Sequence, residues 1–151
     1  MNRLVVMVGL PRSGKTTRAR QMGYPIVNPD SIRLALHGQR FAGLAEPFVW
    51  AIAKCMVRAL FLAGHDMVVL DATNNSRKRR DEWKSRDWVR IFDCVTTSAA
   101  VCRERAYAEN DTEILAVIDR MELEKQPIEP DEFTEDEARI LLTTGGTGGL
   151  P

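Results

Sequence analysis

The chain has 151 residues, of which 44% are hydrophobic and 28% charged, a composition typical of a globular domain. A chain of this length is expected to fold around one core, because chains divide into domains only beyond roughly 250 residues. The longest apolar run, residues 4–10, is shorter than the ~18 residues of a membrane-spanning helix and lacks a signal-peptide cleavage site. We therefore expect a single cytoplasmic domain.

The three cysteines, Cys55, Cys94 and Cys102, are widely spaced and form no CxxC pair. Disulfide frameworks and zinc sites depend on paired cysteines at characteristic spacings. We therefore expect reduced thiols in the core.

The formal net charge of zero conceals two halves of opposite charge. Residues 1–90 contain 16 Lys and Arg against 7 Asp and Glu, whereas residues 91–151 contain 5 against 14. A basic first half can face a polyanion such as a nucleic acid, while an acidic second half limits indiscriminate attraction. Ordinary solvated surface charge explains the same distribution, so the sequence leaves both interpretations open.

The first two predicted elements are a strand and a helix joined by a short loop. Residues 4–8 form a β-branched run that ends at Gly9, which is typical of a buried parallel strand. Residues 15–22 contain no helix breaker, and Gly23 then ends the predicted helix.

A second strand and two helices follow. Residues 24–27 are a short strand candidate that Pro29 ends, and Asp30 is expected to cap a helix that continues to about residue 36. Residues 46–63 place apolar side chains at helical spacing, and Gly64 follows.

Strands and helices continue to alternate in the second half. Residues 67–70 and 89–95 are predicted strands on either side of the Arg/Lys-rich segment 77–86, and residues 98–109 and 112–125 are predicted helices. Such alternation predicts a single α/β domain with a parallel β-sheet of about four strands flanked by helices on both faces. Ligands bind at the carboxyl ends of the strands in such folds.

Residues 9–16 match the P-loop (Walker A) pattern G-x-x-x-x-G-K-[ST] between a predicted strand and a predicted helix. In such loops, backbone N–H groups and the helix N-terminus surround the phosphates of a nucleotide. Lys15 is expected to bridge the β- and γ-phosphates, and the Thr16 hydroxyl to bind Mg²⁺. A Gly-rich turn without a ligand is the alternative, which the strand–loop–helix context disfavours.

Other classes of P-loop protein fit the rest of the chain poorly. No N-K-x-D motif for guanine recognition is present, and Ala72 follows Asp71 where ring ATPases place a Glu to activate water. A small kinase remains, and it requires a base for the acceptor hydroxyl, cations for the developing charge and a lid that excludes water.

Asp30 and Arg33 are candidates for the acceptor side of such a kinase. Both follow the second strand, at the same edge of the sheet as the P-loop, and a three-residue spacing puts them on one helical face. Asp30 can accept the proton of an attacking hydroxyl, and Arg33 can hold a phosphate with two hydrogen bonds. Helix capping is the alternative role for Asp30, and we expect it to serve both.

Asp71, Thr73 and Asn74 follow the third strand. Asp71 is placed to hold a Mg²⁺-bound water, and Thr73 or Asn74 to touch the substrate. The start of another capped helix is the alternative. The cations of residues 77–80 oppose the dipole of the next helix, which hints at an external anion, although a solvated helix face is the favoured interpretation.

Arg103 and Arg105 lie on the predicted helix after the fourth strand. Residues two apart do not share a helical face, so at most one of them points inward easily. Either can be a lid arginine that closes on the γ-phosphate, and surface charge is the equally weighted alternative.

Four segments, residues 9–17, 27–33, 69–74 and 102–105, resemble the 5′-hydroxyl polynucleotide kinase family in its phage-type kinase domain. The resemblance covers about residues 3–125. It implies ATP and Mg²⁺ as cofactors, Asp30 as general base, Arg33 on the acceptor phosphate, Lys15 and Thr16 on ATP, and a lid arginine near Arg105. The full set of predicted nucleotide-binding residues is Gly9, Pro11, Arg12, Ser13, Gly14, Lys15, Thr16, Thr17 and Arg103.

We therefore predict a P-loop kinase domain over residues 1–130 that transfers the γ-phosphate of ATP to a hydroxyl of a nucleic acid, as a single strand or an end. The acceptor is either the 5′-hydroxyl of DNA or RNA or a hydroxymethylated base in DNA. The alternatives are a kinase for a nucleoside, sugar or antibiotic, and an ATP-binding module without transfer. Residues 131–151, acidic and then rich in Gly and Thr, are predicted to form a mobile tail.

Overall fold

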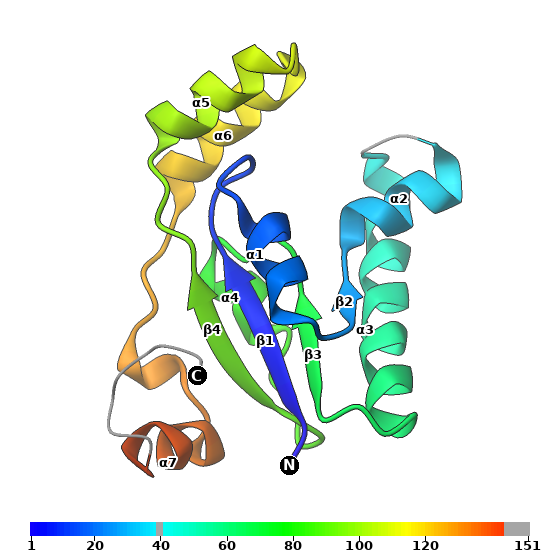
Figure 1. Ribbon diagram of the computed structural model, residues 1–151. Coiled ribbons are helices and arrows are strands. Elements are labelled where there is room, and N and C mark those ends of the chain that lie inside the picture. The colour runs from blue at the N-terminus through cyan, green and yellow to red at the C-terminus, as the bar shows by residue number, and fades with distance from the viewer. Residues whose placement is uncertain (39–40, 144–151) are drawn as a thin grey trace.

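The computed structural model describes residues 1–38 and 41–143 and contains a four-stranded parallel sheet in the order β2-β3-β1-β4 (Figure 1). The strands are β1 (Arg3–Val8), β2 (Ile26–Val27), β3 (Met67–Leu70) and β4 (Val89–Cys94). The helices are α1 (Lys15–Met22), α2 (Pro29–His37), α3 (Glu46–Leu62), α4 (Arg77–Asp81), α5 (Ala99–Ala108), α6 (Glu113–Glu124) and α7 (Glu135–Thr143), with 3₁₀ turns at Gly43–Ala45 and Pro130–Glu132. The predicted α/β architecture is confirmed.

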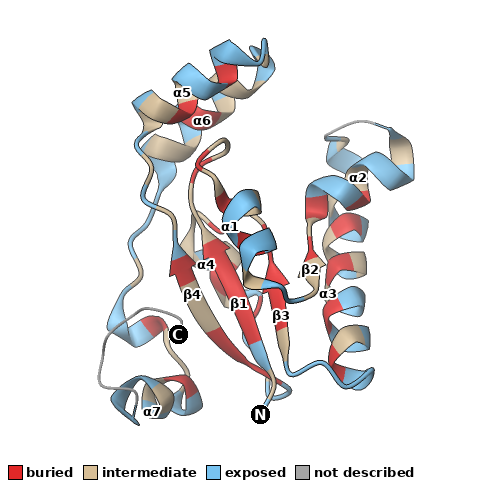
Figure 2. Ribbon diagram, in the orientation of Figure 1, coloured by how far each residue is buried: buried red, intermediate tan, exposed pale blue. Residues whose placement is uncertain are grey.

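Helices cover both faces of the sheet, because successive residues of β1 point to opposite sides. Leu4 and Val6 pack with the buried face of α3, whereas Val5 and Met7 pack with Ala19 of α1. The sheet is accordingly buried along most of its length, and the outer helical faces are exposed (Figure 2).

The beginning of α2 differs from the sequence prediction. Asn28, not Asp30, is the N-cap: its side-chain oxygen accepts hydrogen bonds from the backbone N–H groups of Asp30 at 2.8 Å and Ser31 at 3.4 Å. Pro29 occupies the first turn, where its missing N–H costs nothing. Asp30 is therefore a residue of the first turn, and its carboxylate is not used for capping.

The helices α5 and α6 form an antiparallel pair above the carboxyl ends of the strands (Figure 1). Their contact surface contains Cys102, Ala106 and Ile118, and Leu10 of the loop after β1 packs into the same cluster. The helical pair therefore packs on the loop after β1 through apolar side chains.

Much of the range predicted as a tail is folded. Glu132 forms a 2.5 Å ion pair with Arg80, and Glu137 of α7 forms a 2.8 Å ion pair with Arg90 of β4. Each of these four residues is at most 3% exposed. The acidic segment up to Thr143 is thus part of the packed fold, and the prediction of mobility now concerns residues 144–151, which lie outside the described residues.

The cysteine prediction is only partly correct. Cys102 is buried, whereas Cys55 and Cys94 are exposed. Cys55 lies two residues from both Ala53 and Val57, which belong to the buried stripe of α3, so it falls on the opposite face.

Across the described residues, no helix has the length and apolarity to cross a membrane.

Candidate active site

The loop after β1 has the backbone geometry of a phosphate cradle. A Cβ atom on Gly9 would lie 2.8 Å from the carbonyl oxygen of Val95, so a side chain there would collide with backbone. Gly14 has a φ of 100° and begins α1 without a side-chain cap, which leaves the first N–H groups of the helix available to an anion. Pro11 lies in the turn of this loop, and Thr17 is exposed in the first turn of α1.

Lys15 folds back over the same loop. Its Nζ atom donates a 2.6 Å hydrogen bond to the carbonyl oxygen of Leu10, and the residue is 7% exposed. Burial lowers the pKa of Lys15 to about 8, although the negative charges of Asp71 and Asp30 act in the opposite direction. A buried cation with so little solvation is well suited to receive phosphate oxygens.

Thr16 and Asp71 meet at the end of β3. The Thr16 hydroxyl donates a 2.6 Å hydrogen bond to the Asp71 carboxylate, and the Asn28 side-chain amide donates a 3.1 Å bond to the same oxygen. The described residues contain no group of three or more His, Cys, Asp or Glu side chains that could hold a metal ion. The paired oxygens of Thr16 and Asp71 fit Mg²⁺, which takes one or two protein oxygens and completes its shell with phosphates and water.

Thr73 and Asn74 differ in their relation to this site. Asn74 is 1% exposed, and its side-chain amide donates a 2.7 Å hydrogen bond to the carbonyl oxygen of Met7. The Thr73 carbonyl accepts a 3.1 Å bond from the Gly9 backbone N–H. The buried Asn74 side chain therefore ties the segment after β3 to β1, whereas Thr73 is half-buried and contacts the P-loop through its backbone.

Arg33 joins the predicted base to a residue that sequence reasoning missed. Its Nη1 donates a 2.7 Å hydrogen bond to Asp30, while Nε and Nη2 donate to the two carboxylate oxygens of Glu46 at 2.9 and 2.6 Å. These bonds use three of the five N–H groups of a guanidinium. Glu46 lies in the first turn of α3, where an acidic residue is expected, but no local pattern indicates its partner.

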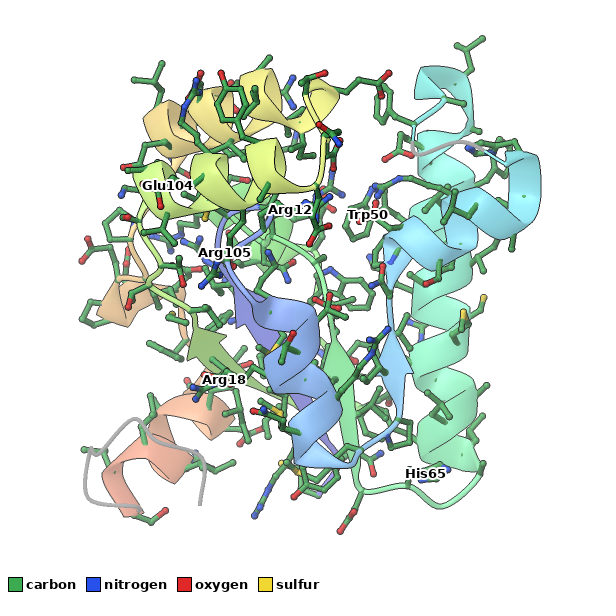
Figure 3. All side chains as sticks on the ribbon, turned by 45° about the horizontal axis from the view of Figure 1, so that its top comes forward. Arg12, Arg18, Trp50, His65, Glu104 and Arg105 are labelled. Carbon is green, nitrogen blue, oxygen red and sulfur yellow. The ribbon has the colours of Figure 1, made fainter. Side chains whose placement is uncertain are left out.

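The two arginines of α5 point in different directions, as their spacing predicted. Arg105 donates a 3.1 Å hydrogen bond from Nη1 to the carbonyl oxygen of Arg12, so it lies over the P-loop (Figure 3). Arg103 pairs instead with Asp119 of α6. Of the two candidates, Arg105 is the one that contacts the P-loop.

Arg12 links the P-loop to the helical pair. Its guanidinium bonds to Asp111 at 2.7 Å and also contacts Glu109, and its backbone φ is 66°. Its side chain thus points to the turn between α5 and α6 in this structure. Ser13, buried in the same loop, is held by a 2.8 Å hydrogen bond from the Thr97 hydroxyl to its carbonyl oxygen.

A hollow of about 460 Å³ adjoins Thr16 and Asp71 and lies between α1, α2 and α3. Its other walls are mostly apolar. They are formed by Arg20, Ile26, Asn28, Ser31, Ile32, Ala35, Leu36, Ile52 and Met56. The hollow is large enough for part of a small organic acceptor.

The family model AAA_33, described as an AAA domain, matches residues 4–126. The chain belongs to this family. The match covers the sheet, the P-loop and the helical pair, and it ends before Glu132 and α7. No curated protein matches the chain.

Several solved structures share the fold of this AAA domain. Two are titled "Structure of Pnkp1/Rnl/Hen1 complex" (26% identity, TM-score 0.62, 69% of this chain and 38% of that one) and "Structure of the Pnkp1/Rnl/Hen1 RNA repair complex" (18% identity, TM-score 0.62, 95% and 45%). A third is a putative kinase from Chloroflexus aurantiacus (17% identity, TM-score 0.54, 78% and 74%). The chain spans less than half the length of the first two. The fold is that of a P-loop kinase domain.

Proposed function

We propose that this domain transfers the γ-phosphate of ATP to a hydroxyl group of a nucleic acid. The observation that carries the proposal is the position of the Asp30–Arg33 pair at the edge of the sheet that holds the P-loop. The negative charge of Asp30 contributes, less than that of Asp71, to raising the pKa of the buried Lys15, which supports placing the predicted base near the predicted phosphate-binding cation. The Asp30 side chain is 69% exposed and accessible to an acceptor.

The residues supply the elements that phosphoryl transfer needs. Asp30 accepts the proton of the acceptor hydroxyl. The oxygen of that hydroxyl bonds to the γ-phosphorus, and the bond between the γ-phosphorus and the bridging β–γ oxygen breaks, which releases ADP. Lys15 offsets the charge on the β- and γ-phosphates, and Arg105 offsets it from the lid side. Arg33 orients Asp30 and keeps N–H groups for an acceptor phosphate.

Thr16 and Asp71 would hold the Mg²⁺ ion, directly and through water respectively. Bound there, Mg²⁺ would neutralise charge on the phosphates of ATP. The Asn28 side-chain amide donates to the same Asp71 oxygen as Thr16, so that carboxylate is oriented before any ligand arrives.

Two observations favour a nucleic acid as the acceptor. Arg33 offers a phosphate contact next to the base, which a neutral sugar would not use. The chain is also similar in fold and at 26% identity to a chain of a Pnkp1/Rnl/Hen1 complex, and the second such structure is described as an RNA repair complex. The 5′-hydroxyl of DNA or RNA and a hydroxymethylated base in DNA both present such a phosphate.

A small-molecule kinase is the second candidate function. The hollow of about 460 Å³ beside Thr16 and Asp71 supports it, because small organic ligands bind in concave sites with apolar walls and few polar groups. A nucleoside or an antibiotic would fill such a space better than an extended strand.

A direct screen distinguishes these functions. ATP labelled at the γ-phosphate is incubated with the protein and with single-stranded DNA and RNA, nucleosides, sugars and aminoglycosides in parallel. Label on a strand supports the proposal, and label on a small acceptor alone supports the second candidate. Stoichiometric ATP binding without labelled product on any acceptor would show a nucleotide-binding module and overturn both.

A further inference from the structure

Arg79 of α4 stacks on an aromatic ring of α3. Its guanidinium carbon lies 4.0 Å from the ring centroid of Trp50, and the Arg33 guanidinium carbon lies 5.9 Å from the same centroid. Both distances are within the range of a cation–π contact. Trp50 therefore brings two cations together, one of them bonded to the predicted base.

Packing against a second tryptophan holds the Trp50 ring in position beside the two arginines. Its ring packs edge-on against the fully buried Trp83, with ring centroids 6.3 Å apart. Figure 3 shows Trp50 on the side of α3 that faces Arg12 and Arg105. The ring thus belongs to the same side of the molecule as the P-loop and the lid.

Stacking leaves the hydrogen-bonding edge of Arg79 largely available. A guanidinium stacks through its flat face and donates hydrogen bonds in its own plane. Within the described part of the chain, the only hydrogen-bond partner of the Arg79 side chain is Glu82, through Nη1 at 2.8 Å. The Nε and Nη2 donors remain for a ligand, and the side chain is 36% exposed.

The neighbouring arginines of the basic segment have other partners. Arg80 is buried against Glu132, and Arg77 pairs with Asp131 at 3.0 Å. Arg79 also forms an ion pair, with Glu82, but among the described contacts it is the one of these three arginines whose guanidinium lies over the Trp50 ring. Arg79 and Arg33 approach the same ring, so an external anion of the kind that the sequence hinted at would bind beside Trp50.

We propose that Arg79, supported by Trp50, binds the second phosphate of a nucleic-acid acceptor, counted from the reacting hydroxyl. This inference rests on the proposed function. Arg33 touches Asp30 and so serves the phosphate nearest the reacting end, whereas Arg79 bonds to Glu82 and shares with Arg33 only the Trp50 ring. The acceptor class is therefore a strand with at least two phosphates, bound without regard to base sequence.

The test compares two acceptors with two variants. The acceptors are a 5′-hydroxyl hexanucleotide and a nucleoside 3′-monophosphate, which has only the first phosphate. Arg79→Ala should raise the KM of the hexanucleotide about tenfold or more, the worth of a charge-assisted hydrogen bond, and leave kcat and the KM of the monophosphate within about twofold. The matched control, Arg77→Ala, removes the same charge from the same segment and should change neither KM.

A second readout separates phosphate binding from a merely structural role. In Arg79→Ala only, the log–log slope of hexanucleotide affinity against salt should become shallower by ~0.7, the value for one phosphate contact. Equal effects of Arg79→Ala and Arg77→Ala on the hexanucleotide would overturn the inference while leaving the proposed function standing. If the wild-type protein transferred phosphate from ATP to neither acceptor, the proposed function itself would be wrong.

Discussion

Arg33 holds Asp30 on one side and Glu46 on the other, with hydrogen bonds of 2.7, 2.9 and 2.6 Å. The arginine side chain is only 14% exposed, whereas that of Asp30 is 69% exposed. The arginine is thus fixed within the protein, and the carboxylate it orients is open to solvent. This arrangement suits a base that must meet an incoming hydroxyl in one orientation.

Lys15→Met should abolish phosphoryl transfer and leave the unliganded protein at least as stable as the wild type. Burial lowers the pKa of Lys15 to about 8, so at pH 7 the free protein has to bury a charge that Met does not carry. Circular dichroism melting and a kinase assay check both parts. A folded variant with near-normal kcat would remove Lys15 from the mechanism.

Asp30→Asn should lower kcat by roughly 10²–10⁴, the usual contribution of a general base, with little change in ATP affinity. Stability should hold, because Asn28 provides the cap of α2. Asn28→Ala is the contrasting variant, and it should cost about 1 kcal/mol of stability. If Asp30→Asn mainly lowered the melting temperature, a structural role would account for the residue.

A strand acceptor should bind less tightly as salt increases, with a log–log slope in affinity of about −0.7 per contacted phosphate. Arg33→Ala should remove about one such contact and weaken strands of different sequence equally. The measurement is the KM of an oligonucleotide between low and moderate salt. A flat salt response in the wild type would favour the small-molecule kinase.

Glu137 should make the attachment of α7 sensitive to acid. Burial raises its pKa, but hydrogen bonds from Arg90 and from backbone N–H groups outweigh burial and hold the pKa below the ordinary 4.5. The stabilisation is therefore complete above pH 4.5 and is lost as pH falls through the lowered pKa. Melting temperatures between pH 3 and pH 7 should fall in acid, and Glu137→Gln should be less stable at pH 7 and show a smaller fall.

Local signals predicted the elements that form the nucleotide site. The helix α1 has the predicted bounds, since the P-loop pattern fixes its start and Gly23, with a φ of 77°, fixes its end. The cap of α2 was misassigned because Asn28 and Asp30 are both good caps. The proline between them was the deciding signal, since proline favours the first helical position.

The pairing of the two oppositely charged halves could not be read from the sequence. Arg80 bonds to Glu132 and Arg90 to Glu137, across 52 and 47 residues of chain. Both members of each pair are buried, so a fraction of the charge asymmetry is internal to the fold and faces neither a polyanion nor solvent. Long-range ion pairs leave no periodic pattern, and an acidic segment alone resembles a solvated tail.

The most direct test of the account is the transfer of labelled γ-phosphate from ATP to a single-stranded oligonucleotide, followed by nuclease digestion to locate the label. Wild type and Asp30→Asn are compared on the same strand. The account predicts label on a hydroxyl of the strand with the wild type and a loss of roughly 10²–10⁴ in its rate with Asp30→Asn. Equal rates in the two proteins, or a wild type that labels no strand while it phosphorylates a small molecule, would contradict it.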